Sequence, residues 1–510
     1  MGGGLMQLVA YGAQDIYLTG NPQITFFKVV YRRHTNFAIK SIRQTLSGNT
    51  GFGIKQNCII SRSGDLVHKI WIGEKNTEYS NGDIYKYIDN VEVKIGGQTI
   101  DKQTSDWNAI KWELTIPESK INGYRNVLSG FSGADTSCYC WYPLNFWFCN
   151  NIGLSIPLIA LQYHELTLDI TWSSQTVAVN PEVWVDYIFL DTDERRKFSQ
   201  ISHEYLIEQI QYQATPGNIS NISLNFNHPI KELIWVNDVS IQTNFSIYAP
   251  LRCTSNVYTS TLNNSYQNAD DMTCKLILNG HDRFGERAVK YFKTIQPLTY
   301  HTRCPSVGKR FIVNCSLPYE NLTTSATLLY NVIKPVRIIE AVLTGTSAAG
   351  NNTTDYTLCI DDGPSEGSSS TITPIQYELG TIENMNNSIN KRTFDAPSDT
   401  YKLLIPAGKH IGIKASTTST IRGFVTLELE ELPLLIEGNQ INLANIYCYS
   451  FSLKPEEHQP SGTCNFSRID KKNLIFNNPV SDANGVTKIF AINYNVLRIN
   501  SGMGGIAYSN

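Results

Sequence analysis

The chain has 510 residues, more than a single hydrophobic core usually supports, so we expect two or three domains. Hydrophobic residues make up 41% and charged residues 17%, which is typical of a folded globular protein and excludes an intrinsically disordered chain. The net charge of −3 provides no global attraction for nucleic acid, and 11 cysteines in a chain this long are too few for a disulfide scaffold.

The amino-terminal region is basic. Residues 16–64 contain no Asp or Glu and seven bases, namely Lys28, Arg32, Arg33, Lys40, Arg43, Lys55 and Arg62. We predict that Lys28, Arg32, Arg33 and Arg43 dock on an acidic partner or an anionic surface. Two alternatives remain open: a solvated surface, or bases that pair with acids elsewhere in the protein.

Strand-like alternation dominates the remainder of the first half. Val91, Val93 and Ile95 alternate with polar residues, and so do Leu166, Leu168 and Ile170. Such alternation predicts antiparallel sheets with one face on a core and the other toward solvent or a partner. Helical signals are few. Thr104 or Ser105 is suited to cap a helix through Leu114, and Thr192 is suited to cap another through Phe198.

A charge-free stretch, residues 136–163, is interrupted by Asn and Pro, which favours buried strands and turns over a membrane span. It contains Cys138, Cys140 and Cys149, and His164 follows it. Their spacing differs from the paired C-x₂-C of a structural zinc site, so we expect buried free thiols and no metal.

We predict that residues 306–445 form an inserted β-rich domain. Strand-like runs alternate there with a Ser/Thr/Asn-rich tract, and residues 338–390 hold seven acids and no Lys or Arg. The G-x-S-x-G spacing around Ser365 lacks the following helix that a hydrolase nucleophile needs. Asp361, Asp362 and Glu366 lack the alternating oxygens of a calcium loop, so we interpret both features as polar surface loops.

Near the carboxyl end, Glu456 and Glu457 stand beside His458, the ingredients of acid–base chemistry. Adjacent acids in a strand would face opposite ways, which argues against a shared site. Phe490, Ile492, Tyr494 and Val496 alternate with Ala491, Asn493 and Asn495, again as in a strand. Many strands and few helices exclude alternating βα folds and leave sandwiches, barrels or jelly rolls.

Several long segments carry a family resemblance. They are residues 10–42, 157–166, 194–211, 228–236, 278–287, 449–470 and 490–510. In this order they resemble the major capsid proteins of nucleocytoplasmic large DNA viruses. The resemblance implies an all-β fold of two tandem jelly-roll sandwiches, with the insert in the second. The expected divisions are residues 1–23 (arm), 24–202 (first jelly roll), 203–305 and 446–510 (second jelly roll), and 306–445 (inserted cap domain).

The resemblance also implies the function. It points to a homotrimer forming a pseudo-hexagonal capsomer in the virion of a large icosahedral virus, assembled in the host cytoplasm. Neighbouring capsomers, minor capsid and penton proteins and an internal membrane surface are the expected partners, with no direct contact to nucleic acid. No catalytic residue, cofactor or metal is expected. The alternative is a carbohydrate-binding or carbohydrate-hydrolysing β-sandwich protein, because jelly rolls also serve lectins.

Overall fold

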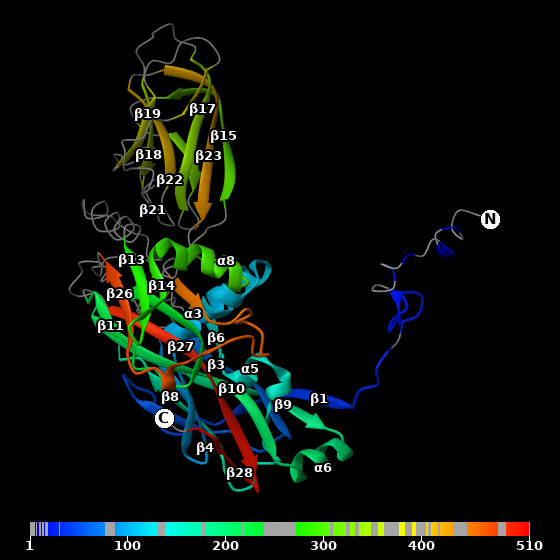
Figure 1. Ribbon diagram of the computed structural model, residues 1–510. Coiled ribbons are helices and arrows are strands. Elements are labelled where there is room, and N and C mark those ends of the chain that lie inside the picture. The colour runs from blue at the N-terminus through cyan, green and yellow to red at the C-terminus, as the bar shows by residue number, and fades with distance from the viewer. Residues whose placement is uncertain are drawn as a thin grey trace.

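The structure is a computed structural model with three pairs of antiparallel sheets, two of them in a double jelly roll (Figure 1). It describes residues 6, 8–9, 12, 15, 19–29, 31–76, 87–129, 138–174, 180–216, 219–238, 272–305, 310–322, 327–331, 336–347, 355–361, 377–382, 390–393, 404–405, 410–416, 419–431, 446–477 and 486–508. The all-β double jelly-roll class expected from the sequence is confirmed.

The first jelly roll has the strand orders β1-β9-β3-β6, with β7 beside β3, and β2-β8-β4-β5. Its strands are β1 (Phe37–Gln44), β2 (Lys55–Ile59), β3 (Leu66–Asn76), β4 (Ile88–Ile95), β5 (Gln98–Thr104), β6 (Cys138–Pro143), β7 (Ile156–Pro157), β8 (Leu166–Trp172) and β9 (Pro181–Leu190). Strands β4 and β5 meet at Gly96 and Gly97, whose φ values of 57° and 83° suit the tight turn of a twisted hairpin.

The second jelly roll has the orders β10-β27-β12-β24, joined by β25 and β28, and β11-β26-β13-β14. Its strands are β10 (His203–Pro216), β11 (Asn221–Ser223), β12 (Pro229–Asp238), β13 (Thr273–Leu278), β14 (His281–Ala288), β24 (Ile446–Ser450), β25 (Cys464–Asn465), β26 (Lys472–Asn477), β27 (Val486–Asn500) and β28 (Met503–Ile506). Strands from both sides of the insert therefore complete a single sandwich.

In the sheet β10-β27-β12-β24, strands β12, β24 and the centre of β27 are buried on both faces, whereas β10 is mostly half-buried or exposed. Along β12, Ile234 and Val236 belong to the core of the first jelly roll, whereas Leu233 and Trp235 belong to the core of the second. Strand β27 was expected to face solvent or a partner on one side, and this is wrong for its central residues: Asn493 and Asn495 are buried. One sheet thus serves both cores, so the two jelly rolls form one packed unit.

The insert has its own pair of sheets, β15-β23-β17-β20 with β21, and β16-β22-β18-β19. The strands are β15 (Arg310–Leu322), β16 (Thr327–Asn331), β17 (Val336–Ser347), β18 (Tyr356–Asp361), β19 (Tyr377–Ile382), β20 (Asn390–Thr393), β21 (Leu404–Ile405), β22 (His410–Ala415) and β23 (Ser419–Glu431). Its core cluster shares no residue with the other two, and the insert lies beyond α8 at the top of Figure 1. The exact domain limits stay a prediction.

The helices of the described chain are short: α3 (Ser105–Thr115), α4 (Ile121–Ser129), α5 (Trp147–Asn150), α6 (Thr192–Gln200) and α8 (Gln296–Tyr300). The predicted cap of α3 is confirmed, because Thr104 Oγ1 accepts from the Trp107 N–H at 3.2 Å. For α6 the cap lies one residue earlier than predicted: Asp191 Oδ1 accepts from the Thr192 N–H at 2.8 Å.

The charge-free residues 136–163 contain β6 and β7, as expected for buried strands, and also the short helix α5, which was not expected. Within the part of the chain that the structure describes, no helix is both long and apolar enough to cross a membrane.

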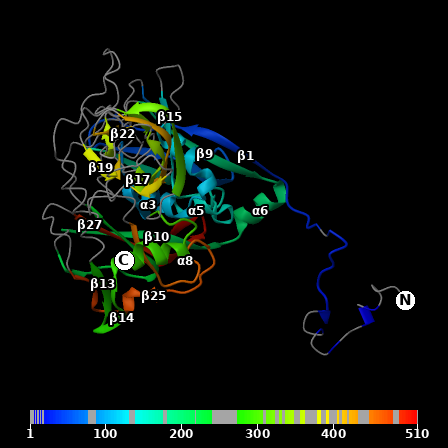
Figure 2. The same cartoon turned by 90° about the horizontal axis from the view of Figure 1, so that it is seen from above.

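The described residues before β1 form an exposed arm. In both views the arm leads away from the jelly rolls (Figures 1 and 2). Its side chains Phe26, Phe27 and Val29 are 89%, 98% and 92% exposed. Single exposed apolar residues are common, but a run of them marks a surface that another molecule covers.

Candidate functional site

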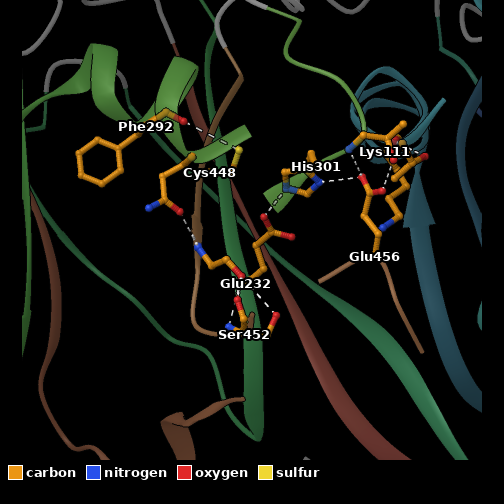
Figure 3. Close-up of polar contacts among 11 residues, drawn as sticks. Lys111, Glu232, Phe292, His301, Cys448, Ser452 and Glu456 are labelled. Atoms are coloured by element: carbon orange, nitrogen blue, oxygen red, sulfur yellow. Dashed lines mark hydrogen bonds and ion pairs between the residues drawn. The ribbon is translucent and has the colours of Figure 1, made fainter. Parts of the chain in front are cut away.

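A buried polar cluster lies where the second jelly roll leads toward the insert. Helix α8 ends at Tyr300, and the next residue, His301, contacts both Glu232 of β12 and Glu456 (Figure 3). The His301 Nε2–Glu232 Oε1 distance is 2.6 Å and the Nδ1–Glu456 Oε1 distance is 3.1 Å. The His301 and Glu232 side chains are each only 1% exposed, so a substrate cannot reach them.

The charges of this cluster set the protonation of His301. Burial by itself lowers the pKa of His301, but the Glu232 carboxylate and hydrogen bonds with Cys448, Glu232 and Glu456 raise the pKa well above its ordinary value. The backbone N–H and hydroxyl of Thr302 both donate to the Glu456 carboxylate and hold it in place. Both ring nitrogens of His301 thus face a carboxylate, an arrangement that favours the protonated ring.

Cys448 of β24 completes the cluster. Its thiol lies 3.8 Å from the Phe292 carbonyl oxygen, and burial raises the pKa of Cys448 to about 11. One ligand atom from each of Glu232, His301 and Cys448 lies within 4.8 Å of the other two. Such a set can hold a proton or a divalent metal ion.

Arg303, two residues after His301, ties the same segment to the first jelly roll. Its guanidinium pairs with Glu113 of α3 and with Glu118, the latter at 3.0 Å, and its backbone N–H donates to the Leu114 carbonyl at 3.0 Å. The segment 301–303 thus contacts both jelly rolls immediately before the insert.

A polar cavity of about 650 Å³ lies on the other side of Glu456. Its lining includes His68, Lys69, Lys111, Glu208, Glu456 and His458. Buried Lys231 pairs with Glu208. Because cations and anions are mixed around the cavity, its charge indicates no particular class of ligand.

The predicted docking residues are not equivalent. Lys28, Arg32 and Arg33 are exposed in the arm, before β1 and outside any strand. Arg43 lies in β1 and forms an ion pair with Glu182 at 3.1 Å. The alternative of internal pairing therefore holds for Arg43.

Two further bases of the same run have internal partners. Lys55 pairs with Glu92 at 2.9 Å and with Asp169 at 3.1 Å. Arg62 donates to the carbonyls of Leu161 and Gln162. The exposed bases of this run that have no internal partner among the described residues are thus those of the arm, together with Lys40 of β1.

The motifs that the sequence analysis set aside do not form a site among the described residues. Cys140 and Cys149 are buried cysteines outside any disulfide, as expected, and His164 hydrogen-bonds with Gly504. Ser365, Asp362 and Glu366 lie outside the described residues, and Asp361 belongs to β18.

Glu456 and Glu457 lie in a turn and not in a strand. They still do not share a site, because Glu457 pairs with Lys454 and Glu456 faces His301. The cluster around His301 was not predictable from the sequence, because its members come from distant segments with no common spacing.

Comparisons with known proteins cover the whole chain. Residues 25–191 match the family described as "Major capsid protein N-terminus", and residues 194–358 and 438–505 match "Large eukaryotic DNA virus major capsid protein". The chain is 38% identical to a major capsid protein of Pyramimonas orientalis virus and 34% identical to one of Paramecium bursaria Chlorella virus 1. Each alignment covers 100% of both chains and so includes residues 306–445, which lie outside the segments that carry the resemblance.

Solved structures agree with the sequence relatives. The crystal structure of PBCV-1 VP54, fitted into a reconstruction of the virophage Sputnik, matches with a TM-score of 0.59 and 29% identity over 95% of this chain and 100% of that chain. A quasi-atomic PBCV-1 capsid structure matches with a TM-score of 0.58 and 28% identity over the same shares.

Proposed function

Because this chain belongs to the family of major capsid proteins of large eukaryotic DNA viruses, we propose that it associates as a homotrimer, the capsomer of an icosahedral shell. It is a structural capsid protein. Three copies, each with two jelly rolls, present six similar sandwiches and so approximate a hexagonal tile. Weak, repeated contacts between the rims of such tiles close the shell.

One observation carries this proposal: the sheet β10-β27-β12-β24 belongs to the cores of both jelly rolls. Since close-packed cores resist deformation, the two sandwiches behave as one rigid body, which a regular tile requires. The exposed arm adds support. Phe26, Phe27 and Val29 need cover that the described part of a single chain does not provide.

The trimer is tested by the mass of the purified full chain in solution. We expect a trimer at micromolar concentration whose interfaces bury more than about 2,000 Å² in total, as obligate assemblies do. Sedimentation velocity and mass photometry measure the mass, and electron microscopy of the same sample reports the outline. A stable, folded monomer at micromolar concentration would contradict the proposal.

We further propose that the insert projects from the outer surface as a cap on the second jelly roll. Its separate hydrophobic core supports an appendage that folds on its own. An outward position leaves the rims of the tile free for contacts, and an acidic, base-free stretch suits solvent better than a buried interface.

The arm is the proposed docking element. Lys28, Arg32 and Arg33 would attract an acidic surface of a minor capsid or penton protein, or an anionic internal membrane, during assembly in the host cytoplasm. Each exposed base contributes about 1 kcal/mol or less near an anionic membrane. The close spacing of these bases and the apolar residues Phe26 and Phe27 supports a combined electrostatic and apolar contact.

Replacing Lys28, Arg32 and Arg33 together with Gln tests this role. We expect normal trimers, with assembly that fails or becomes sensitive to salt. Arg43→Gln is the matched control, because its ion pair with Glu182 assigns it to the body of the first jelly roll. Trimers of the triple variant that fall apart would instead place these bases in contacts within the trimer.

The alternative of a carbohydrate-binding or carbohydrate-hydrolysing protein is not supported by the comparisons, whose relatives are capsid proteins. A structural role without catalysis is the function that we propose. Incubation of the purified trimer with a panel of glycosides should release no product.

A further inference from the structure

Glu232, His301 and Cys448 converge from three segments onto one face of a sheet. Strands β12 and β24 are antiparallel neighbours in which Ile234 pairs with Cys448 and Glu232 pairs with Ser450. Glu232 and Cys448 are therefore diagonal neighbours on the same face, close enough for their side chains to approach each other. His301 reaches this pair from the segment after α8 (Figure 3).

A proton on His301 leaves two features of the cluster unexplained. The second carboxylate oxygen of Glu232, Oε2, is buried and has no hydrogen-bond partner in the part of the chain that the structure describes. An unpaired carboxylate oxygen inside a protein is costly. The Cys448 thiol beside it is 1% exposed; it faces His301 and lies 3.8 Å from the Phe292 carbonyl oxygen, a long distance for a hydrogen bond. A cation next to both groups would satisfy them.

The surroundings of His301 match those of a metal-bound imidazole. His301 Nδ1 faces Glu456 Oε1 at 3.1 Å, while Nε2 faces Glu232. A histidine that binds a metal through one nitrogen almost always donates its other N–H to a carboxylate or a carbonyl oxygen. Glu456 is in turn held by the N–H and hydroxyl of Thr302, so its orientation is fixed as well.

We propose that Glu232, His301 and Cys448 form a structural zinc site, with Glu456 as the carboxylate that orients His301. Thiolate, imidazole and carboxylate together favour Zn²⁺ over Mg²⁺ or Ca²⁺, which prefer oxygen ligands alone. One thiolate, one carboxylate and one neutral imidazole also balance the charge of Zn²⁺, which matters at a site with no access to water. The second carboxylate oxygen of Glu232, Oε2, is available as the fourth ligand of the zinc ion.

The required movement is small. Zinc bonds of about 2.0–2.3 Å place tetrahedral ligand atoms roughly 3.3–3.7 Å apart. The three ligand atoms already lie within 4.8 Å of one another. Binding therefore needs shifts of about an ångström and exchanges the proton on His301 Nε2 and that on Cys448 Sγ for one metal ion.

The consequence is a metal cross-link at the base of the insert. His301 belongs to the segment that contacts both jelly rolls, and β15 of the insert begins a few residues later. Fixing His301 to β12 and β24 would hold the start of the insert on the second jelly roll. This role does not depend on the number of subunits in the capsomer.

The first experiment uses the full, unmodified chain. After removal of metal with a chelator and dialysis, Co²⁺ is added as a spectroscopic probe for zinc. We expect about one Co²⁺ per chain, with the visible bands of tetrahedral cobalt and a thiolate-to-cobalt charge-transfer band in the near ultraviolet. Zn²⁺ should displace the cobalt and raise Tm by a few degrees. Absence of both bands, with no effect of Zn²⁺ on Tm, would overturn the proposal.

Variants then locate the site. Cys448→Ser should abolish the charge-transfer band and the Zn²⁺-dependent rise in Tm. Cys274→Ser is the matched control, because Cys274 is an equally buried thiol of the same jelly roll outside the cluster, and it should leave both signals intact. Glu456→Gln should weaken zinc binding about 10- to 100-fold without removing the cobalt bands. Equal metal binding by Cys448→Ser and the unmodified chain would refute this location.

Discussion

Asp101 makes the stability of the double jelly roll depend on pH. This residue of β5 is 4% exposed, and its Oδ1 accepts from the Ile210 N–H of β10 at 3.0 Å, so it links the two jelly rolls. Gln103 Nε2 donates to Oδ2 at 3.0 Å. Burial raises the pKa of Asp101 from 3.8 to about 7, although these hydrogen bonds oppose the rise.

The direction of the effect follows from the two pKa values. The folded protein holds this proton more tightly than the unfolded chain, so the contribution of Asp101 is fully present below about pH 4 and is lost as pH rises through about 7. At about 1.4 kcal/mol per pKa unit, the total is about 4 kcal/mol. About 3 kcal/mol of it falls between about pH 5 and about pH 8.

Asp101→Asn removes the titration while keeping the shape of the side chain. We subtract the Tm of the unmodified chain from the Tm of the variant at each pH. This difference should be several degrees more positive at pH 8 than at pH 5, because only the unmodified chain loses stability as Asp101 ionises. Differential scanning calorimetry at both pH values measures it. Asp193→Asn, in exposed α6, is the control and should show no such shift. A constant difference for Asp101→Asn would refute the reasoning, because Asp101 would then keep one charge state throughout.

Three further predictions concern the packing. Arg303→Ala should destabilise the protein by about 3 kcal/mol, since it removes the cation of a largely buried ion pair with Glu113. Arg498→Ala, which breaks an exposed pair, should cost less than about 1 kcal/mol, and equal losses of Tm would contradict the distinction. Trp235→Ala should cost about 3–5 kcal/mol because the side chain is fully buried, and an unchanged denaturation midpoint would argue against this core. Replacing residues 306–445 with a short Gly/Ser linker should leave trimers intact, because the insert has its own core; loss of all soluble trimer would show that the insert is part of the jelly-roll fold.

Local features of the chain were predictable from the sequence. Alternation of apolar and polar residues marks the strands, and Thr104 marks the start of α3, because periodicity and capping depend only on neighbours along the chain. These signals restricted the fold to β-sandwiches, barrels or jelly rolls. The choice of a double jelly roll came from the family resemblance, which reflects the whole order of segments.

The same local signals did not reveal whether the polar face of a strand contacts solvent or another part of the protein. Asn493 and Asn495 of β27 have the alternation of a solvent-facing row, yet both are buried and hydrogen-bond with Gln209 of β10. A polar residue on a strand can satisfy its hydrogen bonds with water or with a buried amide, and the sequence pattern is identical in the two cases.

Only the tertiary structure assembled the cluster around His301 and distinguished among the bases that were predicted to dock. Glu232, His301 and Cys448 are far apart in the chain, and they meet because β12 pairs with β24 across the insert. Likewise, Arg43 differs from Arg32 only because pairing of β1 with β9 places Glu182 within reach of Arg43. Both outcomes depend on contacts between distant segments, which are determined by the packing of the complete chain and not by local sequence.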